Sequence, residues 1–124
     1  MPKGRLWPLD YTFDTIVEFQ GGPPIERDGF VFERRAGDFR FLDENGKPTR
    51  DVAAVRRFQF YCPKQERGEK VSYCGEIRVG FHVKPPGART WAWDGNFENP
   101  TLQPSINCLE CWHGYVTGGN FKPA

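Results

Sequence analysis

Hydrophobic and polar residues alternate along two long stretches of the chain. From Tyr11 to Gln20, aromatic, Val and Thr residues occupy the odd positions, and mostly polar residues occupy the even ones. From Val71 to Lys84, hydrophobic residues again hold most odd positions, while the even positions carry mostly polar residues, including His82. A period of two is the pattern of a strand that buries one face. We therefore predict a half-buried strand in each stretch, with His82 on the polar face of the second.

Turn residues divide the sequence between these stretches into short elements. Phe30–Arg35 and Asp38–Leu42 are predicted to form two strands that the turn at Ala36-Gly37 joins into a hairpin. Asn45-Gly46 supplies the next turn, and the Gly-Gly-Pro-Pro run at 21–24 ends the strand before them. These elements predict a meander.

Thr49–Arg57 is the only stretch with a helical pattern. Val52 and Val55 share a face, and Thr49 or Asp51 can cap the start, so we expect at most two helical turns. Glycine (14 residues) and proline (11 residues) interrupt every longer stretch, and aromatic residues make up 15% of the chain. The sequence predicts a mostly β protein: a small single-domain antiparallel β fold, meander or sandwich-like, with at most one short helix.

Length and charge narrow the classes of function. The 124 residues are enough for one domain, 1–124, with a single core. The chain has 17 Lys and Arg residues and 16 Asp and Glu residues, so its net charge is only +1. This charge does not provide the concentrated basic face that a nucleic-acid binder needs. No apolar run is long enough to span a bilayer, and residues 1–8 lack the hydrophobic segment of a signal peptide. We expect a cytoplasmic protein that binds neither nucleic acid specifically nor membranes.

One serine and one histidine are spaced to meet across a hairpin. If the chain turns at Cys108 to Glu110, Ser105 lies directly across from His113, with Cβ atoms roughly 4.5–5.5 Å apart. A Ser Oγ at that distance can reach an imidazole nitrogen, which is the arrangement of a nucleophile and its general base. The alternative is that Ser105 supports a turn and His113 is a polar residue on a half-buried strand. Spacing alone leaves both interpretations open.

The four cysteines suggest a metal site. Cys108 and Cys111 are two residues apart, a spacing that lets one turn present two sulfurs to a zinc ion, whereas Cys62 and Cys74 are separated by eleven residues. We predict one structural zinc held by all four. Two disulfides, four independent buried thiols and a redox Cys-x-x-Cys are the alternatives.

The region 58–121 resembles a family of small phage and bacterial proteins, long classed as a domain of unknown function and often mislabelled "ammonia monooxygenase". The motifs that carry the resemblance are Cys62-Pro63, Cys74-Gly75, Trp-Ala-Trp-Asp-Gly at 91–95, Pro-Thr-Leu-Gln-Pro-Ser-Ile at 100–106 and Cys-Trp-His-Gly at 111–114. Members of this family in bacterial ubiquitin-like conjugation operons are proposed serine peptidases with a Ser-His dyad. The insertion Lys64–Tyr73 is unusual for the family, and the aromatic-rich residues 1–50 have no recognised counterpart.

The resemblance implies a serine hydrolase or peptidase that acts on a peptide or ubiquitin-like tail. Ser105 would be the nucleophile and His113 the general base, and backbone N–H groups after the Pro104-Ser105 turn would stabilise the oxyanion. The zinc would lock the register of the hairpin rather than activate water. Asp94 and Glu110 are the nearest acids, and neither is assigned to the site.

A non-enzymatic function competes with this interpretation. A phage accessory or virion protein, or another protein-binding module, could keep a zinc-stabilised β fold only to contact a partner, and it would then be virion-associated or located in the bacterial host cell. We interpret Trp91 and Trp93 as structural and Gly118-Gly119 as a turn. A catalytic metal site built from His82, His113 and Cys111 is disfavoured because His82 is expected on the opposite face.

Overall fold

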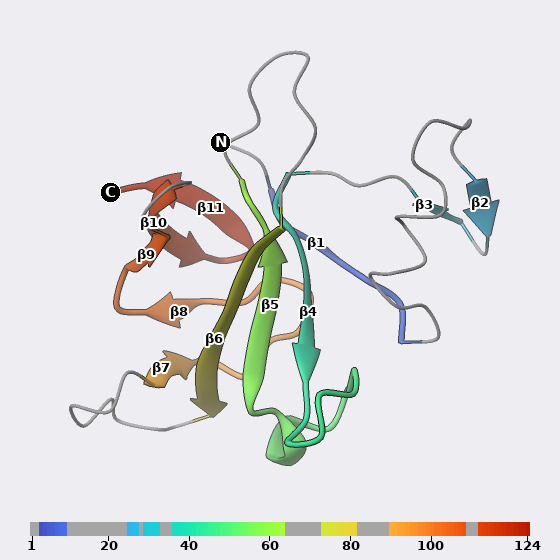
Figure 1. Ribbon diagram of the computed structural model, residues 1–124, viewed down its shortest axis with the longest axis horizontal. Coiled ribbons are helices and arrows are strands. Elements are labelled where there is room, and N and C mark those ends of the chain that lie inside the picture. Colours follow the sequence, from blue (N-terminus) through green and yellow to red (C-terminus); the bar gives the residue numbers. More distant parts are fainter. Residues whose placement is uncertain are drawn as a thin grey trace.

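The computed structural model describes residues 3–9, 25–27, 29–32, 36–63, 73–81, 90–108 and 112–124. The largest sheet has the strand order β1-β4-β5-β6-β7-β8, with β1 at Arg5–Leu6, β4 at Asp38–Leu42, β5 at Arg57–Tyr61, β6 at Tyr73–Phe81, β7 at Thr90–Trp93 and β8 at Leu102–Gln103. A second sheet has the order β11-β10-β9, with β9 at Ile106–Cys108, β10 at Trp112–Thr117 and β11 at Asn120–Pro123. A separate pair consists of β2 at Ile25–Arg27 and β3 at Phe30–Phe32. In Figure 1, β4, β5 and β6 run side by side through the centre, β8 to β11 lie on one side of them, and β2 and β3 lie on the other.

An aromatic core joins the six-stranded sheet to the three-stranded sheet. Phe58 and Phe60 of β5 are buried, and their rings lie 6.4 and 6.0 Å from the ring of Phe121 in β11, measured between centroids. Ile106 and Val116 from the smaller sheet belong to the same buried cluster. Burying each such side chain contributes on the order of 1.5–3 kcal/mol, so the contact between the sheets stabilises the fold. It also fixes which face of the smaller sheet remains in solvent.

The central strand of the smaller sheet, β10, alternates buried and exposed residues along its whole length. Along β10, Trp112 and Val116 are buried while His113 and Tyr115 are exposed. This alternation follows from the period of two in a strand that covers a core on one side only. The exposed face is therefore the face that carries His113.

The predicted helix is present as a single turn. Val52–Ala54 form a 3-10 helix, and the side chain of Asp51 caps it by accepting a hydrogen bond from the N–H of Ala53 at 3.0 Å. The mostly β fold with at most one short helix is thus confirmed. Of the eight strand pairings between the described residues, six are antiparallel and two, β1–β4 and β6–β7, are parallel.

The predicted hairpin of Phe30–Arg35 with Asp38–Leu42 is wrong. β3 pairs with β2, and β4 is flanked by β1 and β5 on its two edges. The reason is an ion pair at the edge of β4: Arg5 stands opposite Asp38 and holds its buried carboxylate with two hydrogen bonds of 3.0 and 2.9 Å. The parallel strand β1 therefore occupies the edge that the meander would have needed.

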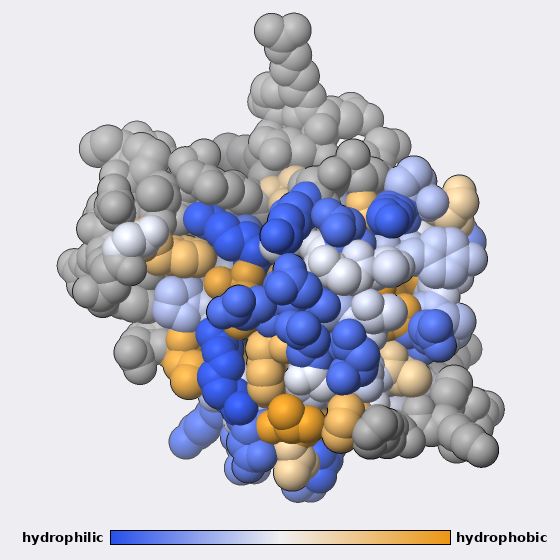
Figure 2. Space-filling model, turned by 180° about the vertical axis from the view of Figure 1, so that it is seen from behind, coloured by the Kyte–Doolittle hydropathy of each residue, from blue (hydrophilic) through white to orange (hydrophobic). Residues whose placement is uncertain are grey.

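The second long alternating stretch forms β6, somewhat shorter than Val71 to Lys84. Val79 is buried and Glu76 and Arg78 are exposed, as the period of two predicts. The predicted strand from Tyr11 to Gln20 and the position of His82 lie outside the described residues. No helix formed by the described residues is long and apolar enough to cross a membrane. On the face seen in Figure 2, hydrophilic residues divide the hydrophobic ones into small areas.

Candidate active site

His113 lies in β10 and Ser105 immediately precedes β9, but the register between these two strands differs from the expected one. His113 pairs with Asn107, and Cys108 pairs with Trp112. The predicted pairing of Ser105 directly opposite His113 is therefore wrong by two residues. A shift of two positions leaves every side chain on its original face, because side chains alternate with a period of two. Ser105 consequently lies diagonally across from His113 on the same face.

Ser105 and His113 are in hydrogen-bond contact. The Oγ of Ser105 lies 3.1 Å from the Nε2 of His113, within the 2.6–3.2 Å range typical of a nucleophile and its base. His113 is exposed and Ser105 is half-buried, so solvent can reach both side chains. The arrangement can pass the hydroxyl proton to the imidazole when the oxygen attacks an electrophile.

A residue of β7 contacts the backbone of Ser105. The indole Nε1 of Trp91 donates a hydrogen bond to the carbonyl oxygen of Ser105 at 3.2 Å. The next residue, Ile106, is 2% exposed and anchors the start of β9 in the core. Between them, the indole and the buried isoleucine fix the position of the backbone that carries the nucleophile. Pro104 precedes it through a cis peptide bond with Gln103.

The hydrogen bond between His113 and the end of the chain beyond β11 shows which kind of cross-strand pair Asn107 and His113 form. The carbonyl of His113 accepts the N–H of Ala124, so the backbone polar groups of His113 point toward β11 and away from β9. His113 and Asn107 are therefore a non-hydrogen-bonded pair, in which the Cα atoms approach to about 4.5 Å and the side chains come closest. Asn107 was not predicted from the sequence. The observation that points to Asn107 is its pairing with His113 across the two strands, which only the folded structure shows.

Several polar groups around the serine have no partner within the described part of the chain. The backbone N–H of Ser105 and the side-chain amide of Asn107 make no hydrogen bond there, and His113 uses only Nε2. A free N–H at the nucleophile is what an oxyanion site requires. These groups can bind a substrate without first breaking an internal contact.

Neither of the two nearby acids is seen to orient His113. Asp94 uses its Oδ1 to accept the N–H groups of Asn96 and Thr101, at 3.1 and 3.2 Å, and so organises the loop between β7 and β8. Glu110 lies outside the described residues. Among the residues that are described, none contributes a carboxylate hydrogen bond or ion pair to His113.

Two of the four cysteines, Cys62 and Cys74, lie at the paired ends of β5 and β6. Cys62 directly follows β5 and is 6% exposed, whereas Cys74 is the extra residue where the β5–β6 register shifts. Cys108 ends β9, and Cys111 lies outside the described residues. Cys62 is in a disulfide, whose partner is one of the three cysteines with undescribed side chains. A disulfide sulfur is not a thiolate, so the predicted four-cysteine site does not fit this oxidised state.

A reduced protein would free all four thiols, and the zinc site stays a prediction for that state. The described side chains contain no cluster of three or more His, Cys, Asp and Glu residues suited to a metal ion. Only one of the four predicted ligands is among them, so this observation does not decide the matter. The catalytic metal site with His82 falls outside the described residues as well.

The tryptophans and the glycine pair have the structural roles that were predicted. Trp93 is 3% exposed and donates from Nε1 to the carbonyl of Asn96 at 2.9 Å. Gly118 and Gly119 join β10 to β11 with φ angles of 56° and 81°, the left-handed conformations that a two-residue turn of this type requires. Trp91 is structural too, and its contact with Ser105 adds a role that its sequence position did not reveal.

Comparison with known proteins identifies the family of this chain. The chain matches the family described as "Bacterial ubiquitination-like system serine protease (BubE)" over residues 48–124, which is 77 of its 124 residues. The chain belongs to this family. The BubE match includes β5 to β11 and so contains both members of the Ser-His contact, while residues 1–47 lie outside it. No curated protein and no solved structure matches the chain.

Proposed function

We propose that this protein is a serine hydrolase that cleaves an amide or ester bond, with Ser105 as nucleophile and His113 as general base. The observation that carries the proposal is the 3.1 Å contact between Ser105 Oγ and His113 Nε2 on a solvent-exposed sheet face. Membership in the BubE family supports a peptide or ubiquitin-like tail as the substrate class.

The reaction begins with attack of Ser105 Oγ on the substrate carbonyl carbon while His113 Nε2 takes the hydroxyl proton. The carbonyl oxygen becomes an oxyanion, and the backbone N–H of Ser105 donates to it. His113 then returns the proton to the leaving amine or alcohol, and the carbonyl–heteroatom bond breaks to leave an acyl group on Ser105. Water, deprotonated by His113, attacks this ester, and His113 returns the proton to Ser105 Oγ as the acyl–oxygen bond breaks, which releases the acid product and the free serine.

Asn107 makes no hydrogen bond to His113 in this structure, but its position opposite His113 suits it to orient the imidazole during the reaction. With Nε2 directed at Ser105, the proton of the neutral imidazole sits on Nδ1, and the carboxamide oxygen of Asn107 is the acceptor on the adjoining strand. A hydrogen bond there would hold the tautomer in which Nε2 can act as base. An amide can serve this purpose where a carboxylate serves in other hydrolases.

Labelling with a fluorophosphonate probe tests the nucleophile directly. We expect the probe to modify Ser105 in the wild-type protein, to modify nothing in Ser105→Ala and to react much more slowly with His113→Ala. The matched control is Thr117→Ala, which removes an exposed hydroxyl from β10 and should leave labelling unchanged. Absence of labelling together with absence of cleavage of a ubiquitin-like protein with a C-terminal extension would contradict the proposal and favour a binding module.

For the reduced protein, we propose one structural zinc held by Cys62, Cys74, Cys108 and Cys111. The support is that Cys62 shares a buried cluster with Ile106 of β9, the strand that Cys108 ends, and with Trp112, the neighbour of Cys111 in the sequence. Protein purified under reducing conditions should contain about one zinc per chain and should melt at a lower temperature after chelation. Reduced protein without zinc that melts at the same temperature with and without chelator would overturn the site.

A further inference from the structure

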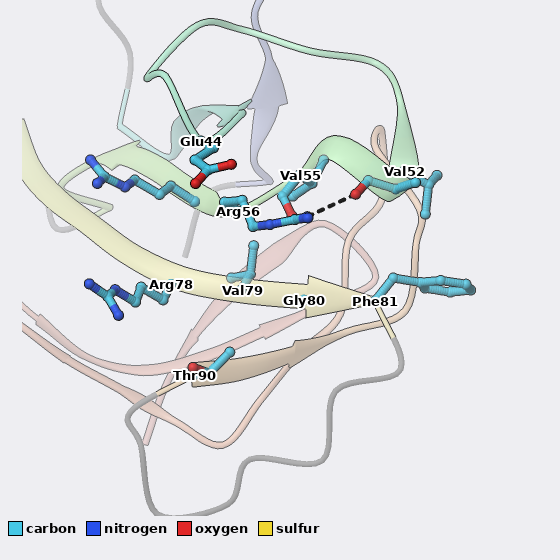
Figure 3. A pocket seen from close by; sticks show the side chains of 11 residues that line it. Glu44, Val52, Val55, Arg56, Arg78, Val79, Gly80, Phe81 and Thr90 are labelled. Atoms are coloured by element: carbon cyan, nitrogen blue, oxygen red, sulfur yellow. Dashed lines mark hydrogen bonds between the residues drawn. The ribbon is translucent and has the colours of Figure 1, made fainter.

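A pocket of about 870 Å³ lies at the end of the large sheet, and none of its lining residues belongs to the proposed active site. Its walls come from the turn after β4, the 3-10 helix and the adjoining parts of β5, β6 and β7. Figure 3 shows Arg78 and Phe81 at opposite ends of the pocket, with Arg56 between them. The volume is within the range of sites that bind small molecules or short peptide segments.

Positive charge is concentrated in this pocket. Three arginines and one glutamate are among its lining residues, namely Arg56, Arg57, Arg78 and Glu44, which gives a local charge of +2 (3 − 1). The whole chain has a net charge of only +1. Clustered guanidinium groups favour carboxylate or phosphate ligands, because their N–H groups can form paired hydrogen bonds to two oxygens.

The placement of two of these arginines is unfavourable without a ligand. Arg57 of β5 stands directly opposite Arg78 of β6, and like charges at such positions destabilise a sheet. Glu76 compensates Arg57 through an ion pair of 3.2 Å. The side chain of Arg78 makes no hydrogen bond or ion pair with the residues that the structure describes. A bound anion would relieve the repulsion and supply Arg78 with a partner.

The third arginine is already held in position. Nη1 of Arg56 donates to the carbonyls of Ala53 and Val55 at 2.8 and 2.9 Å, and Figure 3 shows this anchoring to the backbone. Its Nε and Nη2 groups have no partner within the described ranges. Because the guanidinium is fixed before a ligand arrives, less side-chain entropy is lost on binding.

Apolar and acidic neighbours define what kind of anion fits. Phe81 is 41% exposed at one end of the pocket, and Val52 also lines it, so part of the surface suits an aliphatic side chain. Glu44 in the lining and Glu76 beside Arg57 would repel a continuous phosphate backbone, but they leave room for separate carboxylates. We propose that this pocket binds an acidic peptide segment of a protein partner, in which carboxylates contact the arginines and an apolar residue contacts Phe81.

This proposal does not depend on the proposed hydrolysis. Ser105 and His113 lie on the exposed face of the smaller sheet, whereas the pocket residues belong to the larger sheet and its connections. Binding should therefore be equal in the wild-type protein and in Ser105→Ala, which separates failure of one proposal from failure of the other.

Fluorescence anisotropy with a labelled peptide of alternating glutamate and leucine tests the pocket. We expect saturable, salt-sensitive binding that disappears when glutamine replaces glutamate in the peptide. Arg78→Glu should weaken binding at least about tenfold, because it replaces an attractive charge with a repulsive one. Arg56→Gln should also weaken binding of the peptide, and it tests a lining residue that does not belong to β6. Thermal melts of both variants establish that they are folded.

Lys122→Glu is the matched control, because it reverses a charge on β11 in the other sheet. Its effect on affinity should stay within about twofold, because Lys122 does not line the pocket and interactions between exposed charges are screened at physiological salt. Absence of saturable binding, equal binding of the glutamine peptide, or an equal loss in Lys122→Glu would overturn the proposal. Equal or tighter binding of an oligothymidylate that is lost in Arg78→Glu would also overturn it and identify a nucleic-acid site.

Discussion

The two sheets share one aromatic core, but the polar side chains on their outward faces differ in how far they are hydrogen-bonded to one another. On the large sheet, Arg40 donates to Gln59 at 2.5 Å, Gln59 donates to Glu76 at 2.9 Å, and Arg57 pairs with the same carboxylate at 3.2 Å. These side chains form a continuous chain of hydrogen bonds across β4, β5 and β6. Their polar groups are largely used up by one another.

The outward face of the smaller sheet has the opposite character. Ser105 and His113 contact each other, while the N–H of Ser105 and the amide of Asn107 find no partner among the described residues. Polar groups that are satisfied internally stabilise a fold, and groups left unsatisfied at a solvent-exposed position are available to a ligand. The hydrogen-bond network on the large sheet is therefore structural, whereas the hairpin has polar groups available for catalysis. On the large sheet, Arg78 differs from its neighbours because its side chain has no partner among the described residues.

Loss of the dyad should have the largest effect. Ser105→Ala, His113→Ala and the double variant are each expected to lower kcat/KM about 10³-fold or more, with nearly the same value for all three, because the two residues act as one unit. Steady-state cleavage of a ubiquitin-like substrate measures this, and the folded state is checked by circular dichroism. Losses that multiply in the double variant would show that the residues act independently.

Gly114 tests how tightly the hairpin is packed on its inner side. A Cβ added at Gly114 would lie 2.0 Å from the carbonyl oxygen of Lys122 and 2.3 Å from the ring of Trp112. Gly114→Ala should therefore cost about 3 kcal/mol of unfolding free energy, since backbone atoms cannot move aside. Gly46→Ala is the control: nothing lies within 4 Å, and only its φ of 79° is strained, so it should cost about 1–2 kcal/mol. Equal costs in urea unfolding would contradict this packing.

Asp38 tests the structural role of the large sheet. Its side chain is fully buried and its partner Arg5 is 23% exposed, so Asp38→Asn should cost about 2–3 kcal/mol, somewhat below the value for a fully buried ion pair. Glu76→Gln, in a more exposed ion pair, should cost less than about 1 kcal/mol. Neither change should alter kcat at a temperature where the protein is folded. A fall in kcat without a fall in stability would erase the distinction between the two faces.

Asn107 sharpens the assignment on the hairpin. Asn107→Ala should lower kcat about tenfold, or roughly 1.4 kcal/mol in the barrier, while the melting temperature stays nearly constant because the side chain is exposed. Asn107→Asp should keep the activity, since a carboxylate also accepts the Nδ1 proton of His113. If the aspartate variant is as poor as the alanine variant, Asn107 instead donates a hydrogen bond to the oxyanion.

Arg78→Glu should give the smallest effect, and one of opposite sign. The new glutamate would face Arg57 across the strands, so the variant should gain roughly 0.2–1 kcal/mol in stability. Arg78→Gln, which removes the repulsion without creating an attraction, should fall between this variant and the wild type. Destabilisation by both changes in denaturant unfolding would mean that Arg78 has a structural partner.

Much of the candidate site could be predicted because its information is local. The alternation along β10 places His113 in solvent, the two glycines at 118 and 119 specify a tight turn, and Asp51 caps the helical turn that follows it. The predicted register was wrong by two residues, yet Ser105 and His113 still share a face, because a shift by an even number preserves side-chain direction. Local periodicity thus determines faces more reliably than partners.

Tertiary structure decided which distant segments pair. Nothing near Arg5 in the sequence indicates that it binds Asp38, 33 residues away, and this ion pair places β1 where a hairpin strand was predicted. In the same way, the indole of Trp91 reaches the carbonyl of Ser105 only because β7 lies beside the start of β9 in the folded chain. The sequence by itself determined the mostly β character and the exposed face of the hairpin. Strand order and the support of the nucleophile depend on long-range contacts, whose energy is gained only when the whole core assembles.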